Sequence, residues 1–164
     1  MSLTLNPAEV LRPRRGFTLV EIMIVVTIIG LLAALGLPAW ARLNRHSRVS
    51  TFVNDLRVGA MAAQNCTLNE GVWPADTGPG ALPSELAGYI DPTFWGKPTS
   101  LGGAWDWDFK QWGGLTGLSV YQPTVDEATM LAVDRTIDDG DLASGQFRQR
   151  SNGYIYILEI HENP

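Results

Sequence analysis

An unbroken apolar stretch near the N-terminus constrains this chain more than any other feature. Residues 17–41 read FTLVEIMIVVTIIGLLAALGLPAWA and contain a single charged side chain, that of Glu21. A helix rises about 1.5 Å per residue, so a helix over this stretch is longer than the roughly 30 Å hydrocarbon core of a bilayer. We therefore expect residues 17–41 to cross a membrane once.

The charges around this stretch bear on its orientation. Three arginines lie in residues 12–16, as expected of a leader that stays in the cytoplasm, and three more lie in residues 42–48. Local charge is therefore balanced and does not set the orientation. Residues 42–164 are long enough to be translocated largely regardless of their charge, so we expect them outside the cytoplasm.

Three kinds of N-terminal segment fit these features. Ala39-Trp40-Ala41 has the small-x-small pattern of a secretory signal peptidase site, although the apolar stretch is longer than a usual signal peptide and contains Glu21. A plain membrane anchor is a second interpretation. The third follows from Glu21, because a carboxylate in an apolar span is costly and needs a cation. Cleavage after Gly16 would place the Phe17 ammonium four residues away, where it could meet Glu21 of a neighbour in a stack of identical helices.

Residues 14–21, RRGFTLVE, resemble the class III signal of type IV prepilins and type II secretion pseudopilins. The resemblance implies that a prepilin peptidase recognises the basic pair Arg14 and Arg15, cuts after Gly16 and N-methylates Phe17. It also implies that Glu21 acts in assembly.

Two further residues match the same family. Gly30 and Pro38 resemble positions that bound a helical stretch that loosens when filaments assemble. Both residues also weaken a helix interior, by about 1 kcal/mol for glycine and about 3 kcal/mol for proline.

The resemblance implies an organisation for the whole chain. We expect a cleaved basic leader (1–16), a transmembrane and assembly helix (17–41), an amphipathic stem helix (42–70) and a globular periplasmic head (71–164). The expected function is that of a structural filament subunit in the bacterial inner membrane, with prepilin peptidase, an inner-membrane assembly platform, membrane lipids and other pilins or pseudopilins as partners.

The stem shows helical periodicity. Apolar residues recur every three or four positions from Val49 to Ala63, and Gly71 is placed to end the helix. Cys66 extends this stripe, so we expect it to be buried. Because it is the only cysteine, it forms no disulfide within the chain. Type IVa pilins close a C-terminal loop with a disulfide, so this head is closer to core pseudopilins of type II secretion.

The head begins with a Gly-, Pro- and Trp-rich loop region, in which a short helix fits residues 83–89. Residues 104–109 alternate in polarity, which places Trp105 and Trp107 on the core face of a strand and Asp106 and Asp108 on the other face as solvated charges. A tryptophan platform for sugars is the functional alternative. It would make the chain an anchored or secreted carbohydrate- or ligand-binding module.

The last third predicts a strand over residues 117–122, a helix over 125–138 and a hairpin of strands 146–150 and 154–160. Together with the N-terminal helix, these elements predict an α+β fold of the pilin-like class, in which one long helix packs on a small antiparallel sheet.

Few other residues of the sequence point to binding or catalysis. The net charge of −5, which becomes −7 once residues 1–16 are removed, disfavours nucleic-acid binding. One cysteine and two histidines exclude the usual zinc motifs, and no catalytic motif marks an enzyme. An acidic group between the last helix and the hairpin predicts either a solvated loop or a calcium site. Its members are Asp134, Asp138, Asp139 and Asp141.

Overall fold

The computed structural model describes residues 16–161. Its elements, in chain order, are α1 (Leu19–Glu70), the 3-10 helix η1 (Ser84–Gly88), α2 (Pro92–Trp95), β1 (Ala104–Gln111), β2 (Leu115–Tyr121), α3 (Glu127–Ile137), β3 (Phe147–Arg150) and β4 (Gly153–Ile160). The chain divides into two compact units that meet inside α1, between Ala41 and Arg42. Each unit is described separately below.

The first unit consists of the N-terminal part of α1. Every residue of this part is exposed, although most of its side chains are apolar. Within residues 16–161, α1 is the one helix that is long and apolar enough to cross a membrane. A helix that is apolar all round is stable only when lipid or other helices surround it.

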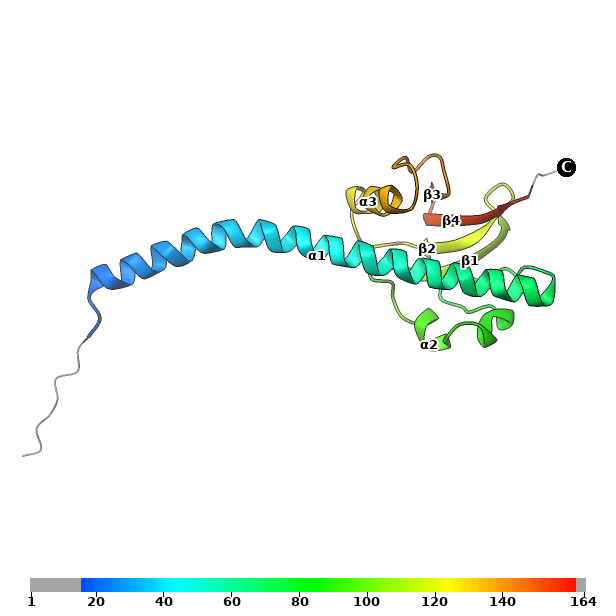
Figure 1. Cartoon of the computed structure of the whole chain (residues 1–164), viewed down its shortest axis with the longest axis horizontal. Coiled ribbons are helices and arrows are strands. Elements are labelled where there is room, and N and C mark those ends of the chain that lie inside the picture. Colours follow the sequence, from blue (N-terminus) through cyan, green and yellow to red (C-terminus); the bar gives the residue numbers. More distant parts are fainter. Residues whose placement is uncertain (1–15, 162–164) are drawn as a thin grey trace, which may run out of the picture. The chain divides into compact units, whose positions relative to one another are not determined.

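In the second unit, the rest of α1 packs against a sheet (Figure 1). Phe52, Leu56 and Cys66 are wholly buried on this face, as the periodicity predicts. Gly59 lies on the same face, and a Cβ there would collide with the side chain of Leu118, so glycine allows a close approach to the sheet. The helix ends at Glu70, and Gly71 follows with a φ of 77°.

The sheet has four antiparallel strands in the order β1-β2-β4-β3. Loops cover parts of its outer edges, which limits edge-to-edge pairing with other chains. Gly80 N donates to Trp105 O beside β1 at 2.7 Å, and Gln149 N donates to Leu142 O beside β3 at 2.8 Å. The α+β, pilin-like fold predicted from the sequence is therefore confirmed.

The core lies between α1 and the sheet. Trp105 of β1 stacks on Phe52 of α1, with ring centroids 5.4 Å apart, and Trp107 is also fully buried. The inward orientation predicted for these two rings is confirmed, and a sugar platform built from them is wrong because their faces are covered. Asp106 and Asp108 were expected to be solvated, but each is only 4% exposed.

The elements of the head follow the sequence closely, with one omission. The predicted strands, hairpin and last helix correspond to β1, β2, β3, β4 and α3, and the short helix expected at residues 83–89 is a 3-10 helix. Helix α2 was missed because it has only four residues. Its signal was Asp91, which caps the helix by accepting a hydrogen bond from Thr93 N at 2.8 Å.

Candidate processing and assembly site

The candidate cleavage bond joins Gly16 to Phe17, directly before α1. Phe17 is 77% exposed, and a Cβ built on Gly16 would meet no atom of the described residues within 4 Å. The fold itself therefore does not require glycine at this position. A requirement for glycine would have to come from a protein that binds the segment. Arg14 and Arg15 lie outside the described residues.

Glu21 lies in the first turn of α1, where a negative side chain is favoured by the helix dipole. Its backbone N–H donates to Thr18 Oγ1 at 3.2 Å, so Thr18 caps the helix. Thr18 and Glu21 have the spacing of a capping box, which is a signal that the sequence contains in addition to the cleavage motif. No ion pair of Glu21 occurs among residues 16–161.

Gly30 and Pro38 both lie inside α1, which continues through them. Proline has no backbone N–H, so the carbonyl of Ala34 lacks its usual helical donor. A Cβ built on Gly30 would meet no atom within 4 Å. These residues therefore cause no break in α1, and nothing in residues 16–161 packs closely against Gly30.

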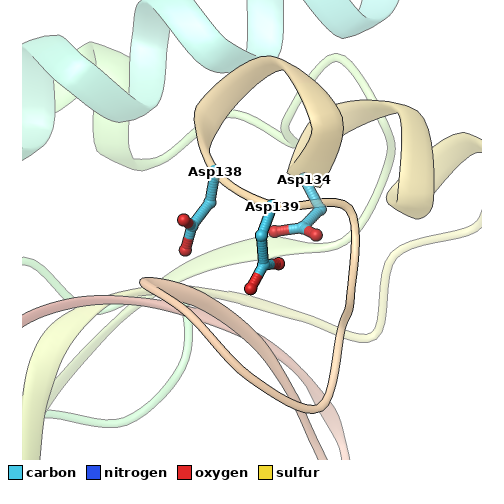
Figure 2. Close-up of side chains that lie close together, drawn as sticks. All are labelled: Asp134, Asp138 and Asp139. Carbon is cyan, nitrogen blue, oxygen red and sulfur yellow. The ribbon is translucent and has the colours of Figure 1, made fainter.

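The structure brings together three of the four aspartates of the acidic group. Each of Asp134, Asp138 and Asp139 offers one carboxylate oxygen, and these oxygens lie within 4.8 Å of one another (Figure 2). Asp134 comes from the last turn of α3, and the other two follow this helix directly. Asp141 is not in this group. Its carboxylate accepts a hydrogen bond from Ala143 N at 3.0 Å and shapes the loop.

Asp134 is the unusual member of the group. Its side chain is fully buried, and neither carboxylate oxygen has a hydrogen-bond partner among the described residues. Burial raises the pKa of Asp134, and the nearby charges of Asp139 and Asp138 raise it further. Asp139 behaves oppositely, because hydrogen bonds from Asp141 N and Ser144 Oγ lower its pKa. A buried carboxylate without a partner, facing two more, suits a hard cation such as calcium.

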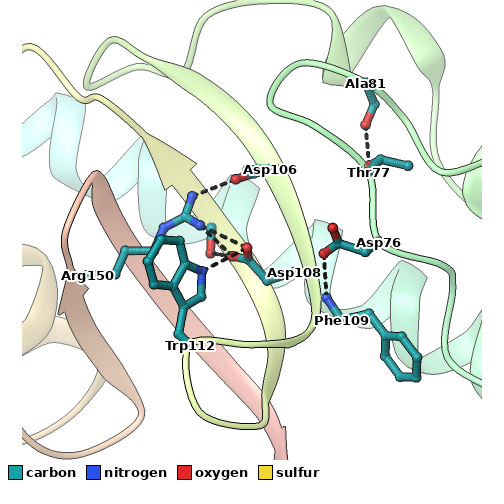
Figure 3. A network of polar contacts seen from close by, with 9 residues as sticks. Asp76, Thr77, Ala81, Asp106, Asp108, Phe109, Trp112 and Arg150 are labelled. Carbon is teal, nitrogen blue, oxygen red and sulfur yellow. Dashed lines mark hydrogen bonds and ion pairs between the residues drawn. The ribbon is translucent and has the colours of Figure 1, made fainter.

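Most polar atoms of a second cluster have partners within the described residues, although the buried Nε of Arg150 has none among them. Arg150 of β3 donates to both carboxylate oxygens of Asp108 at 2.8 and 2.9 Å, and to Asp106 at 2.6 Å (Figure 3). Ser119 and Trp112 also donate to Asp108, and the Trp112 ring lies over the guanidinium, 5.2 Å from centroid to Cζ. This cluster explains why the two aspartates are buried rather than solvated. No local pattern in the sequence predicts it, because its members come from three strands and a turn.

The Arg150 cluster holds two carboxylates for one guanidinium. Burial raises the pKa of Asp106, and the hydrogen bond from Arg150 opposes this rise. The cluster lies on the face of the sheet opposite to α1, and its ion pairs link β3 to β1, which indicates a structural role in joining the strands.

Comparison with known proteins identifies the N-terminal region. The family model of the prokaryotic N-terminal methylation motif matches residues 11–37. The type IV major pilin protein PilE of Neisseria gonorrhoeae is 40% identical over 63 residues, which cover 38% of each chain. The fimbrial protein EcpC of Eikenella corrodens is 37% identical over 75 residues, 46% of this chain and 49% of that protein.

A further relative is fimbrial protein Q of Moraxella bovis, which is 43% identical over 61 residues, 37% of this chain and 38% of that protein. The chain thus spans less than half the length of each of these three relatives. No solved structure matches. The chain carries the prokaryotic N-terminal methylation motif in residues 11–37 ahead of an α+β, pilin-like head, and part of it is similar to type IV pilins and fimbrial proteins.

Proposed function

We propose that this chain is a structural, non-enzymatic subunit of a type IV pilus-like filament. One observation carries the proposal: the methylation motif of residues 11–37 coincides with the start of α1, whose apolar side chains in residues 19–41 are exposed in the described part of the chain. A lipid bilayer covers such a helix before assembly, and a bundle of the same helices covers it afterwards. Partial similarity to pilins and fimbrial proteins agrees with this function.

In the proposed sequence of events, residues 17–41 anchor the precursor in the inner membrane with the head in the periplasm. Prepilin peptidase removes residues 1–16 and methylates Phe17. An assembly platform then transfers the subunit into a filament with other pilins, where the Phe17 amine of one subunit meets Glu21 of its neighbour. Gly30 and Pro38 permit the intervening helix to loosen during this transfer.

A type II secretion pseudopilus is our more specific proposal. It rests on Cys66, which is the only cysteine of the sequence and is buried and unpaired, so the head has no disulfide-closed loop. Deletion of the gene in its native host should then abolish export of secreted enzymes while surface pili persist. Loss of surface pili with normal export would assign the chain to a pilus instead.

Mass spectrometry of the membrane-bound protein tests the processing step. We expect the mature chain to begin at Phe17 with an added methyl group on its amine. Gly16→Ala should still be cut in part, whereas Gly16→Leu should leave the full precursor, because the fold leaves this position open and only the peptidase restricts its size.

The matched control is Gly36→Leu, a glycine with equally open surroundings farther along α1, which should not affect cleavage. A soluble product that begins at Arg42 would contradict the proposal and show that the segment is a secretory signal peptide. An uncut, membrane-bound wild-type chain in a host with active prepilin peptidase would also contradict it.

We further propose that Asp134, Asp138 and Asp139 hold a calcium ion. The buried carboxylate of Asp134 supports this, because it has no partner within the described residues and faces two other carboxylates. A bound cation would compensate this charge and tie the loop after α3 to the helix. Asp141, which was also predicted as a ligand, shapes the loop in this proposal.

Thermal unfolding of the full chain in detergent, with calcium or with a chelator, tests the cation site. Calcium should raise the Tm of the wild type, and should have no effect on Asp134→Asn. The control Asp76→Asn, which changes an aspartate near β1, should keep the full response. If calcium leaves the Tm of the wild type unchanged, the proposed calcium site is wrong.

A further inference from the structure

Two exposed arginines follow the apolar stretch directly in the sequence. Arg42 and Arg45 lie on α1 in the second unit, and both are exposed. On the translocated side of a membrane segment, basic residues are disfavoured because they oppose the usual charge asymmetry. In the orientation proposed above, these residues therefore need a compensating interaction.

The nearby Arg48 has such an interaction within the head. Its Nε donates to Ser100 O at 2.8 Å, and Ser100 Oγ donates to Arg48 O at 3.0 Å. Arg48 thus holds α1 to the loop before β1. Among the described residues, Arg42 has no hydrogen bond or ion pair through its side chain.

Arg45 is only loosely held. Its guanidinium lies 3.6 Å from the carboxylate of Asp126, and the two side chains are 53% and 56% exposed. Ion pairs this exposed contribute little to stability. Asp126 already caps α3, because its carboxylate accepts a hydrogen bond from Thr129 N at 3.0 Å. Arg45 is therefore available to a stronger anionic partner.

The end of the apolar stretch has the composition of a membrane interface. Trp40, which is 67% exposed, precedes Arg42 by two residues, and tryptophan is enriched at the headgroup level of bilayers. Arginine side chains near the end of a membrane helix reach the headgroups while their stems stay in apolar surroundings. The planar guanidinium also matches the oxygens of a phosphate in a bidentate arrangement.

We propose that Arg42 and Arg45 bind the phosphates of anionic phospholipids in the leaflet that faces the head. The inference rests on the proposed membrane anchoring of residues 17–41, and it adds a lipid class and two named residues. The contact holds the unassembled subunit at a fixed depth in the bilayer. Entry into a filament removes the subunit from these lipids and breaks the contact.

The test uses the full chain in phosphatidylcholine vesicles that contain phosphatidylglycerol. Electron spin resonance with spin-labelled lipids compares the association of the two lipids with the protein. We expect phosphatidylglycerol to be preferred, and each arginine to contribute on the order of fivefold at low salt. The preference should fall in Arg42→Gln/Arg45→Gln, whereas the leader arginines contribute equally to every variant.

Two controls separate lipid binding from changes in charge or folding. Arg57→Gln/Lys97→Gln removes the same charge from exposed positions farther along the chain, and should keep the preference. Asp126→Asn removes the ion pair of Arg45 but still permits a helix cap, and it should preserve or increase the preference. Equal losses in Arg42→Gln/Arg45→Gln and Arg57→Gln/Lys97→Gln would overturn the inference.

The outcomes also separate this inference from the proposed function. A wild-type chain that inserts stably, resisting extraction by alkaline carbonate, but shows no preference for phosphatidylglycerol would overturn the lipid contact alone. A chain that fails to insert in any vesicle would overturn both the lipid contact and the membrane anchoring on which it rests.

Discussion

The two parts of α1 are built from one helix and differ in what surrounds them. In residues 19–41, large apolar side chains such as Leu31 are exposed on every side. In residues 42–70, apolar side chains such as Leu56 form one buried stripe against the sheet. The same backbone hydrogen bonds therefore serve two environments, because the pattern of side chains selects which faces must leave water.

The first part of α1 and the head also differ in whether their carboxylates have a cation nearby. In the first part, Glu21 has no ion pair within the described residues, and the partner proposed for it is the Phe17 amine of a neighbouring subunit. In the head, the buried Asp106 and Asp108 find their cation in Arg150 of the same chain. The carboxylate of the N-terminal part is thus unpaired within the described residues, whereas the two buried carboxylates of β1 are paired within the head.

Replacement of Glu21 is the strongest test of this difference. Glu21→Ala and Glu21→Leu should be cut normally and keep the Tm of the head, yet lose most filament formation or secretion. The reason is that, in the proposed filament, pairing with a neighbour's Phe17 amine stabilises only the correct axial offset. Each variant is expressed as the sole copy and scored for processed protein and for assembly.

Glu21→Gln sharpens this prediction. Glutamine keeps the polar residue of the capping box but removes the charge, so a cap defect and a charge defect become distinguishable. We expect it to fail in assembly like the other variants. Normal filaments with Glu21→Gln would show that the carboxylate acts only at the helix start.

Loss of Arg150 should be the largest change in head stability. Arg150→Met leaves two buried carboxylates without a cation, which should lower the free energy of unfolding by about 3–5 kcal/mol. Asp106→Asn should be far milder, because Arg150 keeps its two hydrogen bonds to Asp108 and the excess negative charge disappears. Urea unfolding in detergent, followed by tryptophan fluorescence, measures both. Equal losses in the two variants would contradict the assigned charge balance.

A matched pair of leucines in α1 tests the two environments directly. Leu56→Ala removes a fully buried side chain and should lower the free energy of unfolding of the head by about 2–5 kcal/mol. Leu31→Ala removes an exposed one and should change it by less than about 0.5 kcal/mol. In assembly the order should reverse, because Leu31 would pack against neighbouring helices in the proposed filament. A large loss of head stability in Leu31→Ala would contradict the conclusion that only the second part of α1 contributes to the core of the head.

The smallest effect concerns pH. Burial raises the pKa of Asp134 in the folded chain, so the native state binds this proton more tightly than the unfolded chain does. The corresponding stability is fully present below the ordinary aspartate pKa and is lost as the pH rises through the folded value. In chelator, the free energy of unfolding of Asp134→Asn should therefore rise relative to that of the wild type as the pH increases from 4 to 7. A difference in free energy of unfolding between Asp134→Asn and the wild type that stays constant from pH 4 to pH 7 would contradict this prediction.

Much of this protein follows from local sequence patterns. The apolar stretch predicts a membrane helix because its length matches a bilayer, and the periodicity from Val49 predicts which face of the stem is buried. Strict alternation around Trp105 predicts a strand with its rings inward. Each of these three predictions depends only on residues that are close together in the sequence. Among the candidate functional residues, Gly16, Phe17 and Glu21 were found in the same way, because a short motif carries them.

The tertiary structure decided those features that depend on contacts between residues far apart in the sequence. Asp106 and Asp108 looked like solvated charges, and only the pairing of β3 to β4, and of β4 to β2, brings Arg150 over them. The sequence showed the acidic group as four aspartates close together along the chain. The fold buries Asp134 and places it beside Asp138 and Asp139. The carboxylate of Asp141 instead accepts a hydrogen bond within the loop. The physical reason is that burial and partnership of a charge depend on which strands and loops meet above it, and a single stretch of sequence does not contain that information.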